Sequence, residues 1–207
     1  MIKSCYWVQT YTGKSFDLSN PLPSMVCIED IAHALATLNR YTGHARWPYS
    51  IAQHSIMVAE IVAATAPELG LPALLHDSPE AYTNDWSSPL KRMMRDADER
   101  DDPRESPGQI PLQVERSIEH AIRLKFRLFY NYPADALASA RRLIKHADLI
   151  ALATEKRDLF GPAPQAGWGD ATGFALPPPL DEPCAEWPWQ LAKTRFLQAF
   201  ERYGGQA

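Results

Sequence analysis

Two apolar residues, Leu74 and Leu75, run directly into an adjacent histidine and aspartate, His76 and Asp77. Adjacent side chains near the end of a helix point about 100° apart, because an α-helix has about 3.6 residues per turn. Both polar groups can therefore turn toward one ion, the imidazole offering nitrogen and the carboxylate oxygen. Taken alone, such a pair is more often a surface histidine beside a capping aspartate. Whether this pair has a functional role depends on which polar residues lie on the other helices.

Helical periodicity dominates the rest of the chain and predicts an all-α fold. Aromatic and β-branched residues followed by Gly13 indicate a short extended or hairpin N-terminal segment. We expect helices over residues 28–39, 50–65, 71–77, 112–129, 134–160 and 189–203, with another starting near Pro89. The charged, proline-containing stretch 96–108 predicts a mobile surface loop, and the Pro/Gly-rich stretch 161–183 predicts an ordered coil.

Composition favours one domain of 207 residues, which is long enough to bury a substantial core. The net charge of −4 disfavours polymeric nucleic acid as a partner, whereas a small nucleotide needs only local positive charge. The three cysteines fit no CxxC spacing and are expected to be reduced thiols. Since there is also no membrane-spanning run and no apolar leader, we expect a cytoplasmic protein without membrane contact.

Polar groups on two other apolar helices can join His76 and Asp77. His54 lies on the 50–65 helix, and Asp148 lies on the 134–160 helix. Buried polar groups need partners, and one ion would satisfy several of them at once. Mixed nitrogen and oxygen ligands suit Mn²⁺, Co²⁺, Fe²⁺, Ni²⁺ or Zn²⁺ better than Ca²⁺. The sequence therefore predicts one divalent transition-metal ion bound by these four residues.

The order of these four residues resembles the HD-domain metal-dependent phosphohydrolases. The similar stretches are residues 49–55, 75–82, 85–91 and 145–148. They are most similar to the bacterial 5′-deoxynucleotidases and phage deoxynucleotide triphosphohydrolases of that family. The resemblance implies an HD-domain helical bundle with its core at about residues 28–160, followed by the coil and helix at 161–207. It also implies the same four-residue metal site, where Mg²⁺ could enter as a second ion with the substrate phosphates.

Two acidic residues near the expected metal site match catalytic positions of that family. Glu80 lies four residues after His76, one turn along a helix, and in similar deoxynucleotidases this position assists proton transfer. Asp85 matches a position close to the substrate and the nucleophilic water. The structural alternatives are a solvated glutamate at position 80 and, at position 85, an N-cap for the helix that starts near Pro89.

Three further residues are candidates for substrate binding. Arg40 precedes the helix break at Gly43, and its guanidinium suits phosphate oxygens, as an arginine in this region does in the family. Arg46 is a competing candidate for that role. Tyr41 stands where similar enzymes tend to have a tryptophan against the sugar, which puts the sugar preference in question. Lys91 matches a phosphate contact.

The resemblance implies hydrolysis of a phosphate ester bond in a small nucleotide, with a deoxyribonucleoside 5′-monophosphate as the expected substrate. One alternative is a deoxynucleoside triphosphate triphosphohydrolase, in which Lys14, Lys91, Arg92 or Arg95 could hold the additional phosphates. A hydrolase of cyclic or signalling nucleotides and a non-catalytic nucleotide-binding HD module are further alternatives. We expect a homo-oligomer, dimer or larger, with a small nucleotide as its ligand.

Overall fold

The computed structural model describes residues 5–98, 109–162 and 175–206. Within these ranges the chain is helical apart from one antiparallel hairpin and the connecting loops. The hairpin pairs β1 (Trp7–Gln9) with β2 (Ser15–Asp17), with Val8 opposite Phe16. The predicted all-α fold with a short N-terminal hairpin is therefore confirmed.

Apart from the short helix Glu80–Thr83, which was not predicted, the helices lie close to the predicted ranges. They are α1 (Ile28–Thr37), α2 (Ile51–Ala63), α3 (Gly70–Leu74), α4 (Glu80–Thr83), α5 (Ser88–Asp98), α6 (Gln109–Lys125), α7 (Ala134–Leu159) and α9 (Trp189–Arg202). Short 3-10 helices are η1 (Pro23–Met25), η2 (Arg40–Gly43) and η3 (Pro67–Leu69). Residues 96–98, predicted to start a loop, belong to α5. The rest of that predicted loop, 99–108, and residues 163–174 of the predicted coil lie outside the described residues.

Local side-chain contacts fix where the first two long helices begin. Ser50 caps α2, since its hydroxyl accepts a hydrogen bond from the backbone N–H of Gln53 at 3.1 Å. Asp30, in the first turn of α1, accepts hydrogen bonds from the backbone N–H and the hydroxyl of Thr12, at 2.7 and 3.1 Å. The carboxylate therefore ties the N-terminal hairpin to the start of α1.

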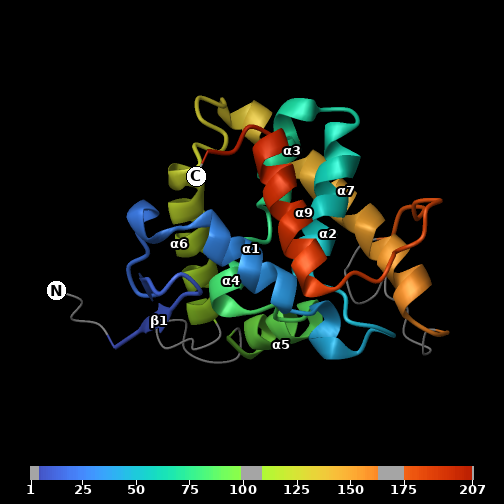
Figure 1. Ribbon diagram of the computed structural model, residues 1–207, viewed down its shortest axis with the longest axis horizontal. Coiled ribbons are helices and arrows are strands. Elements are labelled where there is room, and N and C mark those ends of the chain that lie inside the picture. Colours follow the sequence, from blue (N-terminus) through green and yellow to red (C-terminus); the bar gives the residue numbers. More distant parts are fainter. Residues whose placement is uncertain (1–4, 99–108, 163–174, 207) are drawn as a thin grey trace.

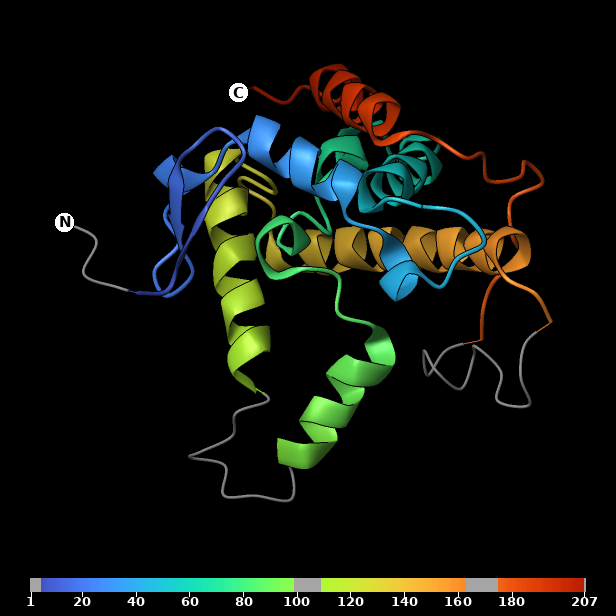
Figure 2. The same ribbon diagram turned by 60° about the horizontal axis from the view of Figure 1, so that its bottom comes forward.

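The helices pack in layers around α2. In Figure 2, α9 lies above α1, α2 and α3, and α7 runs beneath them; contacts of α9 with α1 and α2, and of α2 with α7, agree with this view. Figure 1 shows α9 crossing in front of α2. The largest fully buried apolar side chains include Phe16, Ile31, Leu35, Ile51, Leu74, Ile118, Ile122 and Phe196. Since α2 lies between two layers, the polar residues Gln53, His54 and Ser55 near its start are buried.

The contact between α3 and the end of α9 requires a glycine at position 70. A Cβ atom at Gly70 would lie 2.4 Å from Cδ1 of the Tyr203 ring. We therefore expect Gly70→Ala to lower the free energy of unfolding by about 1–3 kcal/mol through overpacking, measured by urea denaturation. Gly161→Ala is the matched control, because a Cβ there meets nothing within 4 Å in the described part of the chain. If both variants unfolded with the same free energy, Gly70 would not be needed for the contact with Tyr203.

Candidate metal centre

His54 lies at the centre of a buried polar cluster. It is on α2, where its side chain is fully buried. Its Nδ1 lies 2.6 Å from Oε1 of Glu155, and its Nε2 faces the other way, 3.3 Å from Oδ1 of Asp148. Glu155 and Asp148 both belong to α7, so the packing of α7 against α2 places a carboxylate on each side of the ring.

His76 and Asp77 lie in a turn and not on a helix, which corrects our prediction of a helix over residues 71–77. The helix α3 ends at Leu74, and α4 begins only at Glu80. Between them the backbone N–H groups of His76 and Ser78 donate to carbonyl oxygens three residues earlier. Apolar periodicity did not reveal this change, because Leu74 and Leu75 are buried in either conformation.

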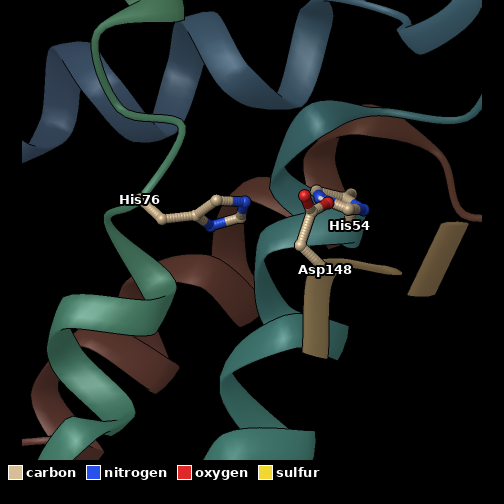
Figure 3. Close-up of side chains that lie close together, drawn as sticks. All are labelled: His54, His76 and Asp148. Carbon is tan, nitrogen blue, oxygen red and sulfur yellow. Dashed lines mark ion pairs between the residues drawn. The ribbon is translucent and has the colours of Figure 1, made fainter. Parts of the chain in front are cut away.

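Three of the four predicted ligands form a group that could hold a metal ion. His54, His76 and Asp148 each offer one ligand atom, and these atoms all lie within 4.8 Å of one another. Figure 3 shows the three side chains converging from α2, the turn after α3, and α7. Asp77 falls outside this group, but its Oδ2 lies 3.2 Å from Nε2 of His76 and 3.6 Å from Nε2 of His54. The structure thus brings together all four residues, while their role as ligands remains a prediction.

The second ring nitrogens orient both imidazoles for metal binding. Nδ1 of His76 lies 2.8 Å from the backbone carbonyl of Ala73, and Nδ1 of His54 faces Glu155. Both partners are acceptors, so each Nδ1 carries a proton and each Nε2 can offer its lone pair to a cation. Both Nε2 atoms are buried and make no hydrogen bond to the described residues, although carboxylate oxygens of Asp148 and Asp77 lie 3.3 Å and 3.2 Å from them. Metal-ligating histidines in proteins have this arrangement, and the residues present fit a bound cation.

The charges around His54 also favour a cation. Burial opposes ionisation of Asp77, Asp148 and Glu155, yet neighbouring imidazoles and, at Glu155, Arg40 lower their pKa values below the usual range. Arg40 and Lys145, whose Nζ lies 2.7 Å from Oδ2 of Asp148, offset part of these three negative charges, and a bound cation would offset the remainder. Burial and Arg40 lower the pKa of His54, but Glu155 and Asp148 outweigh them and raise it to about 9. Without a cation, a proton on Nε2 therefore supplies part of the missing positive charge.

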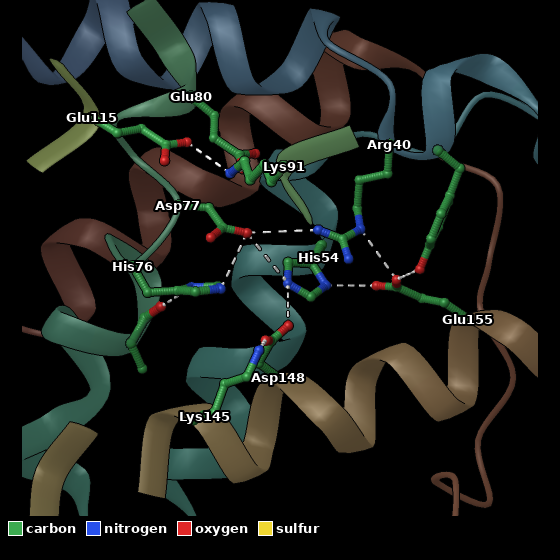
Figure 4. A network of polar contacts seen from close by, with 12 residues as sticks. Arg40, His54, His76, Asp77, Glu80, Lys91, Glu115, Lys145, Asp148 and Glu155 are labelled. Atoms are coloured by element: carbon green, nitrogen blue, oxygen red, sulfur yellow. Dashed lines mark hydrogen bonds and ion pairs between the residues drawn. The ribbon is translucent and has the colours of Figure 1, made fainter. Parts of the chain in front are cut away.

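Glu80 lies beside this cluster on α4, with only 7% of its surface exposed. Burial, together with the negative charges of Asp77 and Asp85, raises the pKa of Glu80 to about 9. Its Oε1 lies 3.7 Å from Nζ of Lys91, which is closer to Glu115, at 2.7 Å (Figure 4). Glu80 is therefore a protonated carboxylic acid at neutral pH in the cation-free site. Glu80 was expected to face the metal site because it would share a helix with His76. It instead begins a separate helix, α4, after the turn that contains His76.

Arg40 and Tyr41 extend the cluster on the other side of His54. Nη1 of Arg40 lies 3.6 Å from Oδ2 of Asp77, and its Nε lies 3.2 Å from Oε2 of Glu155. The hydroxyl of Tyr41 donates to the same oxygen of Glu155. Arg46, the competing arginine, is exposed, and its backbone N–H donates to the carbonyl of Leu159. Of the two candidates, Arg40 is the arginine that touches the cluster.

A cavity of about 300 Å³ opens beside the expected metal ligands, between α6 and α7. Its walls include His76, Asp77 and Asp148 together with Arg123, Arg141 and Lys145. These basic residues were not among the candidates for additional phosphates. Of those candidates, Lys14 is exposed near the hairpin, and the side chain of Arg95 lies outside the described residues. The structure therefore places basic side chains of α6 and α7, which the sequence analysis did not consider, next to the expected metal ligands.

Glu155 is the central residue that the sequence reasoning missed. It is fully buried and contacts His54, Arg40 and Tyr41. The sequence did contain an indication of this role. Glu155 follows Asp148 by seven residues, about two helical turns, and therefore lies on the same face of α7. An acidic residue on the apolar face of a helix, in register with an expected ligand, indicates a buried partner.

The fold and this cluster define an all-α protein with a His–His–Asp group that could hold a metal ion and in which His54 is fully buried. No family model matches the chain. An uncharacterized protein of Rhodobacter capsulatus is 32% identical over 162 residues, which cover 75% of this chain and 74% of that protein. The uncharacterized protein YfdR of Escherichia coli strain K12 is 33% identical over 153 residues, covering 74% and 72%. The chain belongs to the family that includes these two proteins.

No helix in the described ranges is both long and apolar enough to cross a bilayer.

Proposed function

We propose that this chain is an HD-domain metal-dependent phosphohydrolase that acts on a small nucleotide, with a deoxyribonucleoside 5′-monophosphate as its preferred substrate. The observation that carries this proposal is the pair of imidazoles whose buried Nε2 atoms converge with Asp148. Their Nδ1 protons are already bound by acceptors, so a role in metal binding explains the two buried nitrogens better than a purely structural one. A divalent ion held by His54, His76, Asp77 and Asp148 would polarise a phosphate oxygen and acidify water.

The neighbouring side chains support hydrolysis over simple binding. Glu80, which keeps its proton at neutral pH in the cation-free site, can donate it to the leaving oxygen of the ester. Asp85 lies close enough to raise the pKa of Glu80 and is the candidate to accept a proton from the attacking water. Arg40 and Lys91 carry positive charge on two sides of the site, where they can bind the phosphate. A module that only binds nucleotide has no need of a buried carboxyl group beside the cation site.

The direct test is a substrate screen with the purified protein. Deoxynucleoside and ribonucleoside mono-, di- and triphosphates are incubated with Mn²⁺, Co²⁺ or Mg²⁺, and the products are identified by chromatography. We expect inorganic phosphate and deoxynucleoside from the monophosphates. Binding of nucleotide and metal without any product would instead support the non-catalytic module.

A triphosphate substrate is the second candidate, and the cavity between α6 and α7 favours it. Arg123, Arg141 and Lys145 line this cavity next to the expected metal ligands. Each is partly neutralised: Arg141 and Arg123 share Glu119, at 3.4 and 4.0 Å, and Lys145 lies 2.7 Å from Asp148. The Nε of Arg123, however, is buried without a hydrogen-bond partner in the described ranges. Two additional phosphates would find donors here that a monophosphate would not reach.

Arg141→Ala distinguishes the two substrates. If triphosphates use the cavity, this variant should raise their KM by about 10-fold or more, the loss of one hydrogen bond to a charged group, and leave monophosphate kinetics unchanged. Arg142→Ala is the matched control, because its guanidinium donates to Ser139 on the same helix and does not line the cavity. Steady-state kinetics with both substrates give the answer. The same KM for triphosphate in both variants would exclude Arg141 from phosphate binding.

A further inference from the structure

A single buried carboxylate joins the two halves of the candidate site. Glu155 is fully buried on α7, and its two oxygens face in different directions. Oε1 lies 2.6 Å from Nδ1 of His54, an expected metal ligand. Oε2 lies 3.2 Å from Nε of Arg40 and accepts the hydroxyl hydrogen of Tyr41, the two residues expected to face the substrate. Figure 4 shows the carboxylate of Glu155 joined by dashed lines to both the imidazole of His54 and the guanidinium of Arg40.

The Oε1 contact determines what His54 can do. A carboxylate cannot donate, so it keeps the proton of His54 on Nδ1 and turns Nε2 toward Asp148. A charged acceptor also makes the imidazole a stronger ligand. His76 provides an internal comparison, since its Nδ1 faces only the neutral backbone carbonyl of Ala73. The two expected imidazole ligands therefore differ in the charge of the group that accepts their Nδ1 proton, which is a carboxylate for His54 and a neutral carbonyl for His76.

The Oε2 contacts hold a segment that is strained. Tyr41 and Thr42 have φ values of 60° and 52°, in the left-handed region that residues other than glycine rarely adopt. Such residues persist where surrounding contacts hold them. The bond from Tyr41 to Glu155 is such a contact, and the edge-on packing of its ring against Phe160, at 5.0 Å between centroids, is another. Glu155 therefore also determines where Arg40 and Tyr41 lie.

We propose that Glu155 is a positioning residue that uses one oxygen to orient the metal-binding ring of His54 and the other to hold Arg40 and Tyr41 toward the substrate. The inference rests on the metal site of the proposed function. Glutamine at this position retains the shape but only one acceptor oxygen. It cannot accept from both His54 and Arg40, so Glu155→Gln should disturb at least one half of the site without leaving a cavity.

The test uses Co²⁺ alone as the probe, with no dependence on activity. Titration of the full chain with Co²⁺ gives the affinity, and proton NMR of the Co²⁺-loaded protein reveals the hyperfine-shifted, exchangeable Nδ1 protons of the two histidines. We expect Glu155→Gln to lower Co²⁺ affinity by about 10–100-fold, as loss of such outer partners typically does. The Nδ1 resonance of His54 should move or broaden, and that of His76 should stay in place.

Asp158→Asn is the matched control for a purely structural effect. Asp158 lies three residues further along α7, and its carboxylate accepts the backbone N–H of Cys184 at 2.7 Å and hydrogen bonds from the guanidinium of Arg157. This variant can lower stability, but it should change neither Co²⁺ affinity nor the two resonances. If Glu155→Gln is too unstable to study, Glu155→Asp keeps the charge, while its shorter side chain cannot reach both partners; the same His54 resonance should move.

Two results separate the possible failures. Wild-type protein that binds no Co²⁺ would refute the metal site and with it the proposed function. Wild-type protein that binds Co²⁺, with Glu155 variants within about twofold of it in affinity and with unchanged resonances, would refute only the role of Glu155.

Discussion

Asp77→Ala is expected to remove the bound metal and the hydrolytic activity together. Asp77 falls outside the group formed by the two histidines and Asp148, but its Oδ2 faces both Nε2 atoms at 3.2 and 3.6 Å. A cation drawn to those nitrogens would therefore meet this oxygen as well. Metal content should fall from one equivalent to less than about a tenth, and the rate by about 10³-fold or more, because several kcal/mol of charge stabilisation disappear. Metal analysis after dialysis and initial rates measure the two effects.

The alternative role of Asp77 is as an ion-pair partner of Arg40, at 3.6 Å. Arg40→Gln separates the two roles, since it breaks that ion pair and leaves every expected ligand in place. It should keep a full equivalent of metal and lose phosphate binding, seen as a higher KM. Full metal occupancy in Asp77→Ala, or equal metal loss in both variants, would show that Asp77 is not a ligand.

Helical periodicity was sufficient to predict the all-α fold class, because α1, α2, α6, α7 and α9 each bury apolar side chains. α1, α2 and α7 begin within one residue of their predicted starts, and the residues after Pro133 and Pro188 begin α7 and α9. Each proline disfavours a helical conformation of the residue before it, and Pro133 and Pro188 are themselves extended, so both helices begin directly after the proline. Such breaks are visible in the sequence without knowledge of the packing.

The conformation around His76 and the role of Glu155 could not be predicted in the same way. A turn and a helical end both bury Leu75, so the apolar pattern does not distinguish them. Glu155 depends on a long-range contact, because its partners His54, Arg40 and Tyr41 are more than a hundred residues away in the chain. Local patterns say where a side chain lies on its helix, whereas the packing of α7 against α2 decides what it meets.

The second large effect is expected from Glu80→Gln. Burial and the charges of Asp77 and Asp85 raise the pKa of Glu80 to about 9, so glutamine closely mimics the neutral acid present at pH 7 in the cation-free site. Metal content and the free energy of unfolding should therefore change little. Glutamine cannot give up a proton to a leaving group, and the rate constant kcat should fall by about 10²–10⁴-fold. Single-turnover measurements at saturating substrate isolate this step.

The pH dependence adds a second signature of Glu80. A general acid acts in its protonated form, so the wild-type rate should fall as the pH rises through the pKa of Glu80. A nearby divalent cation favours the carboxylate and places this pKa below 9. The alkaline decline should be absent from the residual activity of Glu80→Gln. Glu115→Gln, which removes the charge of the closer partner of Lys91, should lower the rate by less than about tenfold and retain the decline. A loss below about threefold in Glu80→Gln would instead reduce Glu80 to a buried structural acid.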